Sequence, residues 1–96
     1  MMIRIVKMKF QPGKENDFLR IYSENEKKIR SSIGCTHLEL LRDTTDPTLF
    51  FTYSHWETEE DLHAYRNSIL FLSVWEKVTL IFSEKAEAWT TEMTAV

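Results

Sequence analysis

The fold is decided by residues 50–68, FFTYSHWETEEDLHAYRNS, in which one periodicity gives way to another. Up to Trp56 the apolar and polar residues alternate, as they do in a β-strand. Thr58 then stands where a helix N-cap is expected, and the acidic residues 59–61 suit the positive end of the helix dipole. This stretch therefore predicts a strand over residues 49–56 that leads almost directly into a helix.

The residue patterns on either side of this stretch predict the remaining strands and helices. Long apolar and β-branched residues ended by Pro12-Gly13 predict a strand at the beginning of the chain. The polar pair Asn67-Ser68 predicts a bend between the helix after Thr58 and a last helix. The full set of expected elements is strands over residues 2–10, 36–43, 49–56 and about 84–92, and helices over about 14–32, from Thr58 to the bend, and over about 70–83.

One polar residue interrupts the apolar stripe of the first helix. Phe18, Tyr22, Ile29 and Ile33 follow helical spacing, and Asn25 occupies a position between them. A buried asparagine needs hydrogen-bond partners. Asn25 therefore either lies at the edge of the stripe and reaches solvent, or lines a cavity as a polar group.

The expected order is strand, helix, strand, strand, helix, strand, which is the ferredoxin-like α+β arrangement in one domain, residues 1–96. Its four-stranded antiparallel sheet carries helices on one face only. The other face still holds large side chains, among them Ile3, Ile5, Phe51 and Tyr53. An apolar sheet face of this size marks an interface. We therefore expect a homodimer in which two sheets pack together as a dimeric α+β barrel.

Composition limits the classes of function. The 96 residues are 43% hydrophobic and 28% charged, as in a soluble globular protein. The net charge is −3 and no segment gathers the basic residues, which argues against nucleic-acid and membrane partners. Cys35 is the only cysteine, so no internal disulfide can form and a cytoplasmic location is expected. At the end of a helix, Cys35 is interpreted as a small buried residue.

Three stretches resemble the antibiotic biosynthesis monooxygenase domain family over nearly the full chain. They are QPGKENDF (residues 11–18), IGCTHLELLRDTTDP (residues 33–47) and YSHWETEEDLHAYRNSILF (residues 53–71). The family builds dimeric α+β barrels of the predicted topology, with the site between sheet and helices. Its members include cofactor-independent oxygenases of phenolic or quinol-type aromatics, haem-degrading enzymes and domains without assigned activity. The matched positions of the third stretch are Trp56, Thr58, Leu62, Ser68 and Phe71.

The resemblance implies a cofactor-independent monooxygenase that oxidises a small quinol or another aromatic compound, with no metal and no cofactor. Such a reaction needs the substrate as an electron-rich anion, which hydrogen bonds and positive charge stabilise. Tyr65 would donate the hydrogen bond and Arg66 would supply the charge. The substrate-binding residues implied are Asn25, Trp56, Phe71 and Trp75.

Each of these residues also has a purely structural interpretation. Trp56 could simply close the core, and Tyr65 could be half-buried with Arg66 reaching to solvent. The family often has histidine where this chain has Tyr65, and glutamate where it has Ser54. These two differences favour an alternative, which is a non-catalytic domain that binds or senses a small molecule; a purely structural dimer is a third reading. Val6 stands where the haem-degrading branch has asparagine, so haem degradation is not expected.

The histidines do not form a metal motif by spacing. His63 has no histidine partner one helical turn away. His37 and His55 can meet across the predicted hairpin, either as an exposed cross-strand pair or as part of a ligand set.

Overall fold

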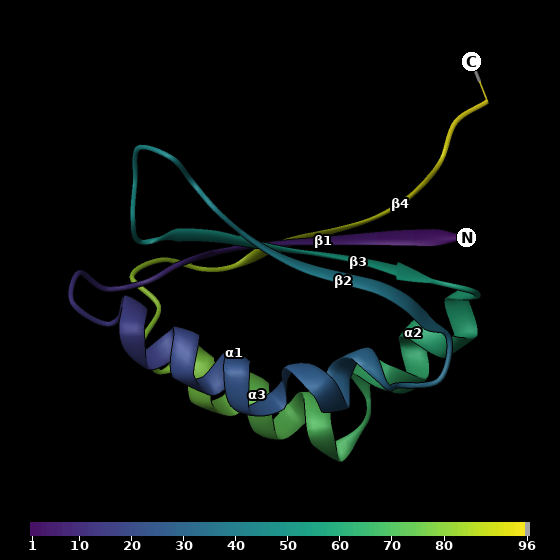
Figure 1. The fold of residues 1–96 in the computed structure, drawn as a ribbon, viewed down its shortest axis with the longest axis horizontal. Helices are drawn as coiled ribbons and strands as arrows, with labels where there is room; N and C mark the ends of the chain where they lie inside the picture. The colour runs from purple at the N-terminus through teal and green to yellow at the C-terminus, as the bar shows by residue number, and fades with distance from the viewer. Residues whose placement is uncertain (96) are drawn as a thin grey trace.

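The computed structural model describes residues 1–95 and contains a four-stranded antiparallel sheet with three helices on one side (Figure 1). This confirms the predicted ferredoxin-like α+β class. No helix among these residues is long and apolar enough to cross a membrane. The elements are β1 (Met2–Lys9), α1 (Glu15–Arg30), β2 (Cys35–Arg42), β3 (Leu49–Trp56), α2 (Glu59–Arg66), α3 (Ile69–Thr79) and β4 (Glu87–Glu92).

The strands lie in the order β2-β3-β1-β4, so the first strand of the chain is central. Ile5 of β1 is paired with Tyr53 of β3 on one side and with Trp89 of β4 on the other. Because side chains alternate along a strand, these three residues share the face that no helix covers. The neighbouring positions, such as Val6, face the helices. The predicted division of the two faces is therefore confirmed.

The hydrophobic core lies where β1 ends and β3 begins. Phe10 is fully buried there, and its ring stacks on Phe18 of α1 with 4.3 Å between the centroids. Phe50 of β3 packs edge-on against both rings, 5.8 Å and 5.0 Å away. Met8 and Val78 complete this buried cluster. The core therefore joins α1 and α3 to one end of the sheet.

Ser68 separates α2 from α3, as predicted. Its hydroxyl donates to the carbonyl of Tyr65 at 2.6 Å and accepts from the backbone N–H of Phe71 at 3.1 Å. One side chain thus ends the first helix and caps the second. The prediction that the last helix continues to residue 83 is wrong, because α3 ends at Thr79. Phe82 instead forms a β-bridge with Phe10.

The end of α1 also differs from the prediction. The helix stops at Arg30, and Ile33, which was placed on its apolar stripe, is 84% exposed. Two backbone hydrogen bonds make a tight turn here, from Ser32 to the carbonyl of Ile29 and from Cys35 to that of Ser32. The turn takes Ile33 off the helix axis, so helical spacing no longer applies to it.

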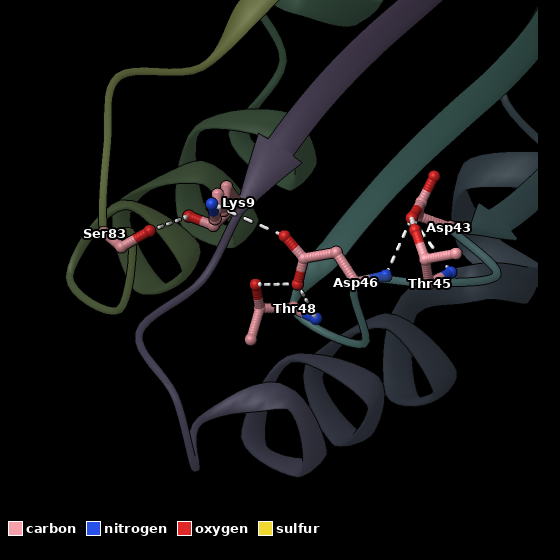
Figure 2. A network of polar contacts seen from close by, with 6 residues as sticks. All are labelled: Lys9, Asp43, Thr45, Asp46, Thr48 and Ser83. Atoms are coloured by element: carbon pink, nitrogen blue, oxygen red, sulfur yellow. Dashed lines mark hydrogen bonds and ion pairs between the residues drawn. The ribbon is translucent and has the colours of Figure 1, made fainter.

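Two aspartates organise the turn between β2 and β3 (Figure 2). The Asp43 carboxylate accepts hydrogen bonds from the backbone of Asp46 at 2.7 Å and from the hydroxyl of Thr45 at 2.8 Å. Asp46 accepts from the hydroxyl and N–H of Thr48, and pairs with Lys9 of β1 at 3.4 Å. These hydrogen bonds lower the pKa of both carboxyl groups, because they favour the ionised form. The turn is thereby fixed to the end of β1.

Candidate functional site

A cavity of about 250 Å³ lies between the sheet and the helices. A cavity of about 150 Å³ can hold benzene, so this one suits a compound of one or two rings. From the side of the sheet the cavity is lined by Arg4, Val6, Met8, Leu38, Thr52, Ser54, Trp56, Ala86 and Ala88. From the side of the helices it is lined by Tyr22, Ile29, Leu62, Tyr65, Arg66, Phe71, Val74, Trp75 and Val78.

The structure brings together all but one of the residues that the sequence proposes for a site. Trp56, Tyr65, Arg66, Phe71 and Trp75 all line the same cavity. They come from the end of β3 and from both helices that follow it. The capping hydroxyl between those helices sets their relative positions.

Asn25 is placed elsewhere. Its side-chain amide donates to the carbonyl of Ile21 one helical turn back, at 2.8 Å, and it is not among the residues that line the cavity. It is half-buried on α1. A local hydrogen bond to the helix backbone thus satisfies the polar residue on the apolar stripe.

The aromatic residues form a continuous wall of the cavity. The rings of Trp56 and Tyr65 are stacked, with 4.8 Å between centroids and 27° between planes. Tyr65 meets Phe71 edge-on at 5.3 Å, and Phe71 stacks on Trp75 at 5.6 Å. Flat, apolar walls of this kind favour planar ligands, which can stack on or pack against the rings.

Trp56 has both of the roles considered for it from the sequence. It is 1% exposed, so it closes the core, and it also contributes to the cavity wall. Its indole N–H donates to the hydroxyl of Ser54 at 2.9 Å, which satisfies the one polar atom of the ring. Ser54 therefore holds Trp56 in place from the same strand.

The phenol of Tyr65 is a hydrogen-bond donor at neutral pH and not a base. Burial raises its pKa well above the ordinary value for tyrosine, because the apolar surroundings disfavour the phenolate. Burial likewise raises the pKa of Tyr22 on the opposite side and of the nearby Cys35 thiol. Cys35 is half-buried and its thiol lies 3.6 Å from the carbonyl of His37. The tyrosines and the thiol around this cavity are thus held in their neutral forms.

The charges in the cavity are both positive. Among the described residues, Arg4 and Arg66 are its only charged lining residues. Arg4 is half-buried on β1, and its guanidinium donates to the hydroxyl of Thr90 at 2.8 Å. Burial lowers the pKa of Arg4, and the positive charge of Arg66 lowers it further.

Sequence reasoning missed Arg4, although a signal for it exists. Alternation along the first strand places Arg4 on the same face as Val6 and Met8, toward the helices. A charged residue on an otherwise apolar, covered face needs a polar partner or a ligand. The apolar residues of that strand predict its two faces, but they do not indicate Arg4.

The histidines lie away from the cavity. His37 and His55 are side by side on the uncovered face of the sheet, with 5.1 Å between ring centroids, and His37 contacts the carboxylate of Glu39. Within residues 1–95 no group of three His, Cys, Asp or Glu side chains could hold a metal ion.

Solved structures share this architecture closely. An antibiotic biosynthesis monooxygenase is 18% identical, with a TM-score of 0.93 over 99% of this chain and 100% of the other. A protein from Nitrosomonas europaea, described as a putative member of the same group, is 20% identical with a TM-score of 0.91 over the same shares. A third, from Bordetella bronchiseptica, is 23% identical with a TM-score of 0.83 over 98% of each chain. At these identities the likeness establishes the fold.

A comparison with curated proteins finds no match. The family model described as "Antibiotic biosynthesis monooxygenase" matches residues 1–77, which is most of the chain. The match includes β1, all of α2, most of α3 and most of the residues that line the cavity. The chain therefore belongs to the antibiotic biosynthesis monooxygenase family.

Proposed function

We propose that this chain is a cytoplasmic, homodimeric monooxygenase that needs no cofactor and oxidises a small quinol or related hydroxylated aromatic compound, with residues 1–96 acting as one domain. The observation that carries the proposal is the combination, in one cavity, of a flat aromatic wall, the neutral phenol of Tyr65 and the positive charge of Arg66. Membership of the family supports the reaction type.

The reaction balances without another reductant. One atom of O2 enters a ring C–H bond as a hydroxyl group, and the other leaves as water with the hydrogens of two phenolic hydroxyls. The substrate supplies every electron and ends as a hydroxyquinone. Negative charge develops on the phenolic oxygen and then on the reduced oxygen. Tyr65 donates a hydrogen bond to the substrate oxygen, and Arg66 stabilises the negative charge.

Removing either group is expected to slow the reaction. With a panel of hydroquinones, Tyr65→Phe and Arg66→Ala should each lower kcat/KM for oxygen consumption on the order of 100-fold, as loss of an oxyanion-stabilising donor does. The measurement is oxygen uptake at an electrode. A matched control is Arg20→Ala on the surface of α1, which should react as the wild type does.

Unchanged turnover in both site variants would contradict these roles. Stabilisation by aromatics without oxygen uptake would instead support a second function, a binding or sensing domain. One observation favours that alternative: among the described residues, no histidine, aspartate or glutamate lines the cavity. Since Tyr65 is held neutral, the cavity offers no conventional general base.

The homodimer is proposed from the uncovered face of the sheet. Leu41 and Trp89 are 44% and 45% exposed there; Leu41 is paired with Phe51, and Trp89 with Ile5. On the same face, the Nε2 atom of His55 is buried without a hydrogen-bond partner in residues 1–95. A second sheet packed on this face would cover the apolar side chains that one chain leaves exposed there.

A charge on this face should separate the protomers. Trp89→Glu places a carboxylate among the apolar side chains and is expected to weaken dimerisation on the order of 100-fold, as loss of a central tryptophan anchor does. Sedimentation should show the wild type at twice the 11.4 kDa mass of the chain and the variant as monomer. Leu72→Glu, at a somewhat more exposed position on α3, should remain dimeric. A monomeric wild type would end the proposal.

A further inference from the structure

The second positive charge of the cavity has no role in the reaction described above. Arg66 is exposed and is assigned to the oxygen that becomes negative. Arg4 lies deeper, half-buried on the central strand β1, and it faces the same cavity. A single phenolate oxygen does not require two arginines, so Arg4 indicates a further negative group on the ligand.

The surroundings of the two arginines leave this charge unbalanced. The chain as a whole has a net charge of −3, yet no acidic residue lines the cavity within residues 1–95. None of the ion pairs among those residues includes Arg4 or Arg66. Two like charges near each other repel, and an anion bound between them relieves that repulsion. The excess of positive charge is therefore confined to this cavity, in a chain that is negative overall.

Arg4 is also held in a defined orientation. One of its N–H groups donates to the Thr90 hydroxyl at 2.8 Å, across the pairing of β1 with β4. The structure gives its other N–H groups no partner among residues 1–95. A guanidinium can form two parallel hydrogen bonds to a carboxylate, and such bonds are strong where water is partly excluded. An oriented, half-buried arginine with free donors is thus suited to a planar anion.

We propose, on the basis of the function proposed above, that the ligand is a hydroxylated aromatic carboxylic acid whose carboxylate is bound by Arg4 beside Arg66. Tyr65 and the stacked rings of Trp56 and Phe71 then hold the aromatic part. The carboxylate is a recognition group and takes no part in oxygen insertion. The proposed substrates are therefore quinols that carry a carboxylate, and not quinols in general.

Binding of a matched set of ligands tests this. Gentisate is a hydroquinone with a carboxylate, and its methyl ester and hydroquinone itself are neutral at pH 7. Wild type should bind gentisate about 10- to 100-fold more tightly than either neutral compound, the range expected for charge-assisted hydrogen bonds. This preference should decrease with added salt. Calorimetric titration under nitrogen measures binding without turnover.

Substitutions assign the preference to the arginines. Arg4→Gln should remove most of the preference for gentisate while leaving the affinity for hydroquinone within about 3-fold, because it removes charge and keeps a polar side chain. Arg66→Gln should reduce the preference and Arg66→Lys should largely retain it. Arg20→Gln, on the exposed side of α1, should change nothing. Thermal unfolding of each variant shows that it is folded.

The possible outcomes separate this inference from the proposed function. Equal affinity of wild type for the acid and its ester would overturn the carboxylate inference and leave a quinol oxygenase standing. A preference that persists in Arg4→Gln would overturn the role of Arg4. A gentisate preference without oxygen uptake would support the inference and contradict the monooxygenase. If none of the compounds binds at millimolar concentration, both proposals fail.

Discussion

Replacing Phe10 with alanine is expected to lower the free energy of unfolding by about 3 to 5 kcal/mol, the usual cost of removing a buried phenylalanine ring. Phe10 has no exposed surface, and its ring contacts those of Phe18, Phe50 and Phe82. The cavity left behind cannot collapse easily, since α1, β3 and the segment after α3 all pack against this ring. In a domain of this size the midpoint of thermal unfolding should fall by roughly 12 °C or more.

The control is an apolar residue on the surface. Ile69→Ala removes a side chain that is 88% exposed at the first position of α3, and it should change the free energy of unfolding by no more than about 0.5 kcal/mol. Both variants are to be compared by denaturant unfolding at one protein concentration, because dimerisation adds to apparent stability. Similar effects of the two substitutions would show that Phe10 is not the centre of the core.

The second large effect is expected at Gly34. Its φ angle of +84° lies in the left-handed region, where a side chain costs about 1 to 2 kcal/mol. A Cβ atom there would also lie 2.5 Å from the Cβ atom of Asp61, at the start of α2, and overpacking of this kind adds about 1 to 3 kcal/mol. Gly34→Ala should therefore lower the free energy of unfolding by about 2 to 5 kcal/mol.

Gly13 provides a control with the same backbone conformation. Its φ angle is +90°, and a Cβ atom there would meet nothing within 4 Å. Gly13→Ala should cost only the backbone part, about 1 to 2 kcal/mol. The difference between the two alanine variants, measured by urea unfolding, is the cost of the contact with Asp61. An equal loss at both positions would mean that α2 moves away without cost.

The sequence predicts the sheet and its faces well because alternation is a local property. Phe51, Tyr53 and His55 must share a face in any β3 strand, whatever packs on it. The break between α2 and α3 is also local, since Ser68 both ends one helix and caps the next through its own hydroxyl. Features of this kind depend on neighbouring residues alone.

The ends of the helices are predicted less well than the strands, because helical spacing alone does not show where a helix stops. Helical spacing extends the last helix past Thr79, but the pairing of Phe82 with Phe10 stops it, and the two residues are far apart in the sequence. Ile33 fits the apolar stripe of α1 by spacing, yet the turn toward Cys35 removes it from the helix. A contact with a distant residue thus outweighs helical spacing at the end of α3, and a tight turn between near neighbours does so at the end of α1.

The candidate site is predicted in part for the same reason. Trp56, Tyr65 and Phe71 can be grouped from the sequence because they lie within one short segment. Alternation puts Arg4 on the covered face of its strand, but its place in this cavity depends on the sheet, which brings β1 beside β3 and under the helices. Asn25 is the reverse case: its position on the stripe indicates a cavity, but its amide bonds to its own helix.

The central place of β1 has a consequence for synthesis of the protein. This strand is synthesised before both of its neighbours, which are residues 49–56 and 87–92. One edge of β1 therefore stays without a sheet partner until residues 87–92 have been translated, and unpaired strand edges can associate with other chains. The nascent polypeptide is therefore a form in which this chain is vulnerable to aggregation.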